Sequence, residues 1–239
     1  MTMNDMKSSG RLRTITGDFQ HLWNDLISFY RLPFGWKRTT WEYVAVGVIV
    51  FPGLFFLDPH IRMFFAEIHT PLLDEVFGFA HWYGKIHLTL DTFVILYVFG
   101  LVLQHEKLRI AGWMIFEAFA ISGIIVTVLK SIFGRWRPYT GHGSFAFVGF
   151  TFGPNAHLSL PSGDVGVAVA YSMILAGFSS NKIWKAFWYL LAVLTCLGRI
   201  YHDQHWFSDV VLAAIISVSV GNYVNATFKE EAMLRSAAQ

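Results

Sequence analysis

Six long apolar stretches divide the sequence and restrict its fold more than any other feature. They occupy residues 41–57, 86–104, 110–129, 162–178, 183–197 and 206–224. A helix that crosses the hydrocarbon core of a bilayer needs about 20 apolar residues, and in lipid every backbone polar group must be bonded within the protein. The sequence therefore predicts an all-α, polytopic membrane protein with six transmembrane helices.

The composition excludes an ordinary soluble domain. Hydrophobic residues make up 54% of the 239 residues and charged residues only 14%, whereas soluble domains carry roughly 25% charged residues. The net charge of +2 says little about partners. The apolar composition makes the lipid bilayer the expected partner, and no nucleic acid is expected. Oligomeric state is left open. Cys196 is the only cysteine, so no disulfide is expected, and no metal or cofactor is predicted.

The remaining segments divide the chain into three regions. Residues 1–40 are predicted to be a cytoplasmic segment with an amphipathic helix, 41–225 a six-helix membrane domain, and 226–239 a cytoplasmic tail. Apolar residues at helical spacing between 16 and 30 are typical of a helix on the membrane surface, or of one packed on the cytoplasmic side of the protein. Residues 58–85 hold no window long and uncharged enough to span, so we expect short interfacial helices there.

The distribution of basic residues predicts the orientation in the membrane. The richer side holds Arg11, Arg13, Arg31, Lys37, Arg38, Lys107, Arg109, Lys182, Lys185, Lys229 and Arg235. By the positive-inside rule this side is cytoplasmic and both termini lie inside. Residues 1–10 lack an apolar core, so no cleaved signal peptide is expected. We expect a bacterial inner membrane, with the segments near residues 130, 162 and 199–209 meeting at its outer face.

The segment between the last two stretches carries unusually many ionisable groups. Arg199, His202, Asp203, His205 and Asp209 all lie within eleven residues, although ionisable groups at membrane depth are costly unless they are paired or used. His205 and Asp209 are four residues apart, which places them on one face of a helix. The carboxylate can then hold one ring nitrogen as its N–H, which leaves the other nitrogen as a nucleophile or a base.

Cations and hydrogen-bond donors are predicted to gather beside this pair. Lys130, Arg137 and Arg199 bring three positive charges to the same face, and guanidinium groups match phosphate oxygens in bidentate geometry. Ser162 and Gly163 open the fourth stretch, where the hydroxyl and the free N–H groups of a helix start favour an anion. Together these residues predict a phosphate site.

The same residues form three spaced clusters in a fixed order. Lys130 stands before Arg137-Pro138 with six residues between, Pro161-Ser162-Gly163 follows, and Arg199 then precedes His205 by six positions and Asp209 by ten. This order resembles the three-part signature of the type 2 phosphatidic acid phosphatase superfamily, and it covers about a third of the chain. Two positions depart from it, because Asp164 stands where that family usually has histidine and Gly198 where it commonly has serine.

The resemblance implies a covalent phosphatase mechanism. In such enzymes the residue that corresponds to His205 attacks phosphorus and forms a phosphohistidine, Asp209 orients its ring, and the cations stabilise charge on the phosphate oxygens. Water then hydrolyses the intermediate. An imidazole nucleophile needs no metal near neutral pH, and positioned cations supply most of the transition-state stabilisation, so the physical argument agrees with the resemblance.

Asp164 leaves three alternatives open, because the family's histidine protonates the leaving group. A raised pKa could let Asp164 act as the acid, although the nearby cations oppose this. His202, His157 or Tyr201 could replace it, or a good leaving group could need no acid. The chain could also be catalytically impaired.

The sequence therefore predicts a membrane phosphatase that removes a terminal phosphate from a lipid phosphate or pyrophosphate at the outer face. Candidate substrates are polyprenyl pyrophosphate, phosphatidylglycerol phosphate, phosphatidic acid and a lipid A phosphate. The alternatives are a lipid phosphotransferase and a non-catalytic lipid-phosphate binding protein. Glu117 and Asp91 lie in predicted spans and have either a functional role or a polar partner on a neighbouring helix.

Overall fold

The computed structural model describes residues 3–237, with side chains described for residues 15–230 and 233, so the charges assigned to Arg11, Arg13 and Arg235 lie outside the described side chains. Its principal helices are α1 (Met3–Arg31), α2 (Arg38–Val50), α3 (Asp58–Glu67), α4 (Pro71–Tyr83), α5 (Ile86–Val102), α6 (Glu106–Phe133), α7 (Gly163–Phe178), α8 (Lys182–Tyr201) and α9 (Phe207–Ala237). Short 3₁₀ helices are η1 (Leu32–Gly35), η2 (Phe51–Phe56), η3 (Pro138–Thr140) and η4 (Asn155–His157). The predicted all-α class is confirmed.

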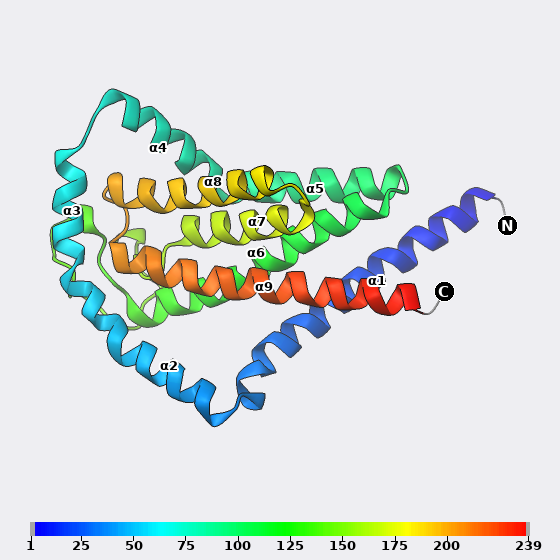
Figure 1. The fold of residues 1–239 in the computed structure, drawn as a ribbon, viewed down its shortest axis with the longest axis horizontal. Helices are drawn as coiled ribbons and strands as arrows, with labels where there is room; N and C mark the ends of the chain where they lie inside the picture. Colours follow the sequence, from blue (N-terminus) through cyan, green and yellow to red (C-terminus); the bar gives the residue numbers. More distant parts are fainter. Residues whose placement is uncertain (1–2, 238–239) are drawn as a thin grey trace.

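Helices α5 to α9 form a bundle whose axes run roughly parallel, with both chain ends at the same end of the molecule (Figure 1). Helix α7 is the central element, and it packs against α6, α8 and α9. Small residues allow this close packing, because a Cβ at Gly166 would already touch Val126 and Ser217 at about 3.4–3.5 Å. Together the buried faces of α6, α7 and α9 form the core around Ile121 and Ile174.

Within the described residues, four helices or helix combinations are long and apolar enough to cross a membrane: Arg38–Phe56, Glu106–Phe133, Lys182–Tyr201 and Phe207–Glu230. A fifth span results if α4 and α5, which meet at a 50° bend, are taken together. Helix α7 is apolar but has only 16 residues. A protein with several membrane-crossing helices is thus confirmed, whereas the number six stays a prediction.

The first predicted span is continued by a change of helix type. Helix α2 ends at Val50, and η2 continues the span with Pro52 in its first turn. Proline lacks the N–H that an α-helix needs at this point. The α-helix therefore ends just before this proline, and the span continues in 3₁₀ geometry.

Residues 58–85 form the two short helices that the sequence predicts, α3 and α4, but α4 does more than lie at an interface. Its Ala80 carbonyl accepts a hydrogen bond of 2.9 Å from the Thr195 hydroxyl of α8, and Ala80 and Tyr83 are fully buried. Helix α4 therefore packs into the bundle, and its last turn lies beside the start of α7. The hydropathy of the segment could not show this, because the packing depends on a partner 115 residues away.

Helix α1 includes residues 16–30, which are predicted to form an amphipathic helix, and extends beyond them at both ends. One face packs on the bundle, where Asp18 pairs with Arg109 of α6 and the Tyr30 hydroxyl donates to the Ile121 carbonyl. The Phe19 ring, although 55% exposed, lies 5.2 Å from the ring of Trp113 on α6, whereas Trp23 is 65% exposed. One face of α1 thus packs on the protein, and Trp23 on the other face is available to lipid.

The proposed division into regions 1–40, 41–225 and 226–239 stays a prediction. Helix α1 packs on the bundle, and α9 continues without a break past residue 226 to Ala237.

Candidate active site

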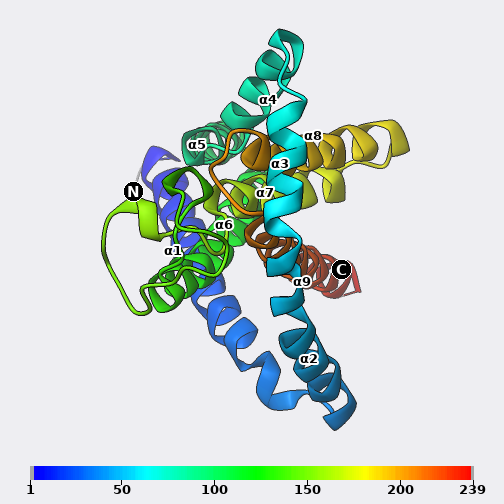
Figure 2. The ribbon, with the colours of Figure 1, turned by 90° about the vertical axis from the view of Figure 1, so that its left-hand side faces the viewer.

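All three predicted clusters lie at one end of the bundle, opposite the chain ends. The end of α6, the loop from 134 to 162 and the link between α8 and α9 meet there, and α3 crosses over them (Figure 2). Gly134 ends α6 with φ of +56°, and a Cβ there would lie 2.1 Å from the Gly149 carbonyl oxygen. Only glycine fits this turn, which brings the loop back across the end of the bundle.

His205 and Asp209 form the centre of the site. The Nδ1 atom of His205 lies 3.5 Å from Asp209 Oδ2, and the two residues are 2% and 0% exposed. The same carboxylate oxygen accepts a 2.9 Å bond from the Trp206 backbone N–H and a bond from the Ser159 hydroxyl. Asp209 thus fixes the start of α9 and faces one nitrogen of the imidazole, which leaves Nε2 for chemistry.

The surroundings of His205 keep its ring neutral. Burial, together with the cations Lys130 and Arg137, lowers the pKa of His205 to about 3, even though Asp209 opposes them. An imidazole with so low a pKa carries a free lone pair throughout the neutral range. A nucleophile of this kind needs no deprotonation step before it attacks.

The three predicted cations all reach this end of the bundle. Arg137 donates from Nε to the Asn155 carbonyl at 2.9 Å and from Nη1 to the Gln204 amide oxygen at 3.1 Å, and burial lowers its pKa. Lys130 donates to the Leu158 carbonyl. Arg199 is 5% exposed. Lys130 and Arg137 are thus held by loop carbonyls and act electrostatically on His205, whereas Arg199 contacts Asp164 and His81.

Ser162 and Gly163, the predicted source of neutral donors, lie at the start of α7. The Ser162 hydroxyl caps the helix by accepting from the Val165 N–H at 3.4 Å, and the Ser162 N–H donates to the Asp209 carbonyl at 3.1 Å. A Cβ at Gly163 would lie 3.7 Å from the Lys130 side chain. The helix start is therefore tied directly to the start of α9, and its first N–H groups lie beside Lys130.

Arg135 and Asp58 form a buried network that sequence reasoning missed. Arg135 donates to Asp209 Oδ1 and Asp58 Oδ2, both at 2.6 Å, and to the Ser208 hydroxyl at 2.7 Å. Asp58 also accepts from the Ser208 N–H at 2.8 Å. The Arg135 guanidinium lies 4.4 Å above the Phe55 ring. Arg135 therefore holds the carboxylate that orients His205.

The sequence carried little signal for this network. Arg135 lies between Lys130 and Arg137, so it could be assigned only as another motif cation. Asp58 lies in a segment with no motif. Their partnership became visible only through the fold, since 77 residues separate them.

Asp164 makes its contacts with Arg199 and with His81, another residue that sequence reasoning missed. Its Oδ2 atom lies 3.2 Å from Arg199 Nε and 3.6 Å from His81 Nδ1. The Arg199 guanidinium also contacts His81 Nδ1. A histidine from outside the motifs thus stands beside the aspartate that occupies the motif position.

The alternative proton donors have other partners. The Tyr201 hydroxyl donates to Asp74, and His157 packs against the Trp136 ring with centroids 3.9 Å apart. The ring of His202 lies 6.3 Å from that of His81.

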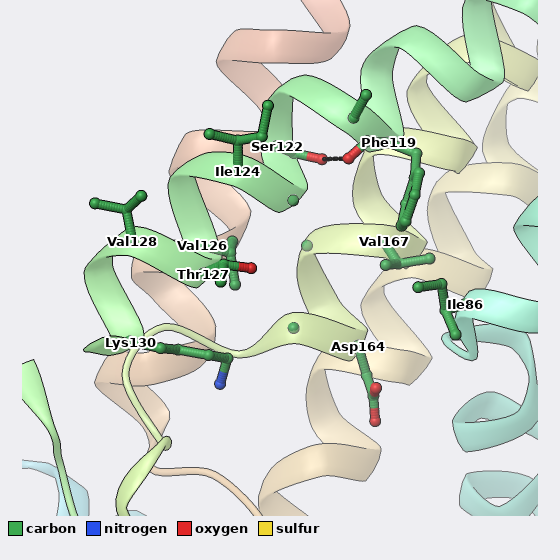
Figure 3. A pocket seen from close by; sticks show the side chains of 14 residues that line it. Ile86, Phe119, Ser122, Ile124, Val126, Thr127, Val128, Lys130, Asp164 and Val167 are labelled. Carbon is green, nitrogen blue, oxygen red and sulfur yellow. Dashed lines mark hydrogen bonds between the residues drawn. The ribbon is translucent and has the colours of Figure 1, made fainter. Parts of the chain in front are cut away.

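A cavity of about 670 Å³ opens next to Lys130 and Gly163 of the predicted phosphate site, between α6, α7 and the start of α5. Lys130 and Asp164 stand at one end of it, and Val126, Val167 and Phe119 line its course along the helices (Figure 3). From Lys130 to Phe119 the lining covers about 16 Å of α6. The cavity is thus polar at the site and apolar away from it.

The two intramembrane carboxylates differ in their surroundings. Asp91 on α5 is exposed, so the expectation of a helix partner is not supported for it. Glu117 is fully buried in α6, where its Oε2 atom lies 3.9 Å from His21 Nδ1. His21 is also 3.1 Å from Asp25, so these three groups converge between α1 and α6.

These features define a class of protein: an all-helical membrane protein with an imidazole–carboxylate pair, three cations and an adjoining apolar cavity at one end of its bundle. The family model of the PAP2 superfamily matches residues 111–232, and this chain belongs to that superfamily. Members are phosphatases acting on lipid phosphates, so the class is that of membrane lipid phosphatases. The predicted family is thereby confirmed.

Two solved structures share the fold. The crystal structure of Aquifex aeolicus LpxE has 24% identity and a TM-score of 0.55, over 70% of this chain and 94% of that one. The crystal structure of a transmembrane PAP2-type phosphatidylglycerolphosphate phosphatase from Bacillus subtilis has 17% identity and a TM-score of 0.59, over 90% and 96%. No curated protein sequence matches this chain. The similarity extends over nearly the whole length of both solved chains.

Proposed function

We propose that this protein removes the terminal phosphate from a membrane lipid phosphate or pyrophosphate through a phosphohistidine on His205. The observation that carries the proposal is the buried His205–Asp209 pair, whose Nδ1 to Oδ2 distance is 3.5 Å, set among Lys130, Arg137 and Arg199. A neutral imidazole next to converging cations suits attack on a phosphate.

The reaction proceeds in two displacements. His205 Nε2 attacks phosphorus, the bond from phosphorus to the lipid oxygen breaks, and that oxygen leaves with a proton from an acid in the site. Water then attacks the phosphohistidine, the phosphorus–nitrogen bond breaks, and inorganic phosphate leaves. Asp209 stabilises the positive charge that develops on the ring, and the cations stabilise the phosphoryl oxygens.

The cavity supports a lipid substrate. Its polar end holds Lys130 and Asp164 and its lining along α6 and α7 is apolar, which matches a phosphate headgroup attached to a hydrocarbon chain. The similar Bacillus subtilis enzyme is a phosphatidylglycerolphosphate phosphatase. Candidates are therefore phosphatidylglycerol phosphate, phosphatidic acid, polyprenyl pyrophosphate and a lipid A phosphate.

The proposal includes an outward-facing site in a bacterial inner membrane, with both termini in the cytoplasm. The excess of basic residues on the side of the two termini supports this orientation. A cysteine placed at Phe152, which is 81% exposed in the loop from 134 to 162, should be labelled by a membrane-impermeant thiol reagent added outside. The half-buried Cys196 is changed to serine in this variant. Labelling only by reagent that has access to the cytoplasmic side would show that the orientation is the opposite of the proposed one.

Phosphate release from a panel of the four candidate lipids in detergent tests the proposed activity. The unmodified chain and Asp164→His are compared, and we expect release by both. Transfer of phosphate to an added acceptor lipid, without free phosphate, would instead support a phosphotransferase. Binding of lipid phosphate without turnover by either form would support the non-catalytic alternative.

Gly123→Leu tests the contribution of the lipid chain to substrate recognition separately from that of the headgroup. Gly123 lines the cavity, and a Cβ there meets nothing within 4 Å, so leucine fits the helix and fills the cavity instead. We expect about a 10-fold lower kcat/KM for a long-chain lipid phosphate, since hydrophobic pockets discriminate on this scale. A short-chain, water-soluble phosphate should be hydrolysed at an unchanged rate.

Gly47→Leu is the matched control for this experiment. Gly47 is also a helical glycine with open space around it, but it does not line the cavity. The Gly47→Leu substitution should leave the hydrolysis rates of both substrates unchanged. Equal kcat/KM values for the long-chain lipid in Gly123→Leu and in the unmodified chain would show that the chain does not bind in this cavity.

A further inference from the structure

The last turn of α4 brings a histidine to the motif aspartate. His81 Nδ1 lies 3.6 Å from Asp164 Oδ2, and the two side chains are 32% and 27% exposed. Both groups therefore border the open part of the site and are shielded on their other sides. The pair has the same make-up as His205 and Asp209, whose corresponding distance is 3.5 Å.

Close packing fixes α4 in this position. A Cβ at Gly84 would lie 2.7 Å from the Thr195 side chain and 3.1 Å from the Asp164 carbonyl oxygen, and a Cβ at Gly198 would lie 3.3 Å from Phe77. Larger residues at either glycine would push α4 away from α7 and α8. Both positions that depart from the family signature, 164 and 198, thus face α4.

The charges around His81 come from three directions. Burial lowers the pKa of His81 in the free site, and Arg199 on α8, Lys85 after α4 and His202 after α8 lower it as well, whereas the Asp164 carboxylate on α7 opposes them. Arg199 contacts His81 Nδ1 and can only donate, so the ring carries its proton on Nε2 in this state.

A bound phosphate changes this balance. Its oxygens attract the Arg199 guanidinium, which then donates to the substrate. The two negative charges of the phosphate also favour an imidazolium nearby. Nδ1 is then free to carry a proton toward Asp164, which leaves the Nε2–H to donate to a second acceptor.

We infer that His81 is the acid that protonates the leaving group and that Asp164 is its positioning carboxylate. The inference rests on the proposed phosphatase function. In the first displacement the His81 imidazolium gives its Nε2 proton to the departing lipid oxygen. In the second, neutral His81 takes a proton from the attacking water, which restores the imidazolium as the phosphorus–nitrogen bond breaks. The histidine that α7 lacks is thus supplied by α4.

The test compares a lipid diphosphate with the monophosphate of the same alcohol. The monophosphate expels an alkoxide, which needs an acid, whereas the diphosphate expels a phosphate, which needs little help. His81→Gln should reduce hydrolysis of the monophosphate by about 10²- to 10⁴-fold and that of the diphosphate by less than about 10-fold. His87→Gln, an exposed histidine on α5, is the control and should change neither rate.

Two further variants separate chemistry from structure. Asp164→His in the His81→Gln background places an imidazole back on α7 and should restore monophosphate hydrolysis at least about 10-fold, because it again provides a general acid. A structural defect would not be repaired in this way. Asp164→Asn removes the charge that favours the imidazolium, so its monophosphate hydrolysis should decline at a lower pH than in the unmodified chain.

The outcomes distinguish this inference from the proposed function. If the unmodified chain hydrolyses both lipids and His81→Gln hydrolyses them at the same rates, the inference about His81 is wrong but the proposed function stands. Hydrolysis of the diphosphate alone would also contradict the inference, since His81 would then give no help to a departing alkoxide. The same holds if the chain hydrolyses lipid phosphate only after Asp164→His. Silence of every form on both lipids overturns the proposed function and the inference with it.

Discussion

His205→Gln is expected to lower phosphate release by about 10⁴-fold or more, the scale seen when a catalytic nucleophile is removed. Glutamine keeps the size of the buried side chain but cannot form the covalent intermediate. The measurement is turnover of a lipid phosphate, together with trapping of labelled phosphate on the denatured protein. The label should be stable in base, labile in acid and absent from the variant.

His157→Gln is the matched control for this prediction. His157 lies in the same part of the molecule but packs on Trp136, so label and turnover should persist. A His205→Gln protein that still acquires base-stable label would show that another residue is the nucleophile.

The pKa of His205 is held near 3 by burial and by nearby cations, so kcat/KM should show no loss from His205 protonation between pH 8 and about pH 5.

Arg135→Leu is expected to lower the free energy of unfolding by about 3–5 kcal/mol, the usual cost of removing one partner from a buried ion pair. Arg135, Asp58 and Asp209 are all at most 1% exposed, and both carboxylates lie 2.6 Å from the guanidinium. The variant would leave two buried carboxylates close together without their cation. Unfolding in detergent, followed by denaturant or heat, measures the loss.

Arg62→Leu provides the comparison. Arg62 also lies 2.6 Å from an aspartate, Asp203, but the two side chains are 38% and 34% exposed. Solvent screens such a pair, so we expect a change of only about 0–1 kcal/mol. Equal losses for the two variants would show that burial does not control the strength of the Arg135 network.

The residues of the candidate site could largely be named from the sequence. Their spacing identifies the family, and hydropathy places Lys130, Ser162 and His205 at the ends of apolar stretches that alternate in direction. Chain direction and the hydrophobic effect alone then bring these ends to one side of a bilayer. For the same reason the all-α class and the amphipathic α1 were predictable, since helical periodicity and the bonding of backbone groups in lipid are local properties.

Only the tertiary structure showed what supports and completes the site. In the sequence Arg135 is indistinguishable from the neighbouring motif cations, whereas in the structure it lies between Asp58 and Asp209. The sequence predicts only short interfacial helices in the segment that contains α4, whereas in the structure Gly84 and Gly198 allow α4 to pack closely against α7 and α8. These contacts join residues between about 70 and 120 positions apart. Side-chain pairing at such separations depends on helix packing and on where small residues permit close approach, and neither is encoded in a local pattern.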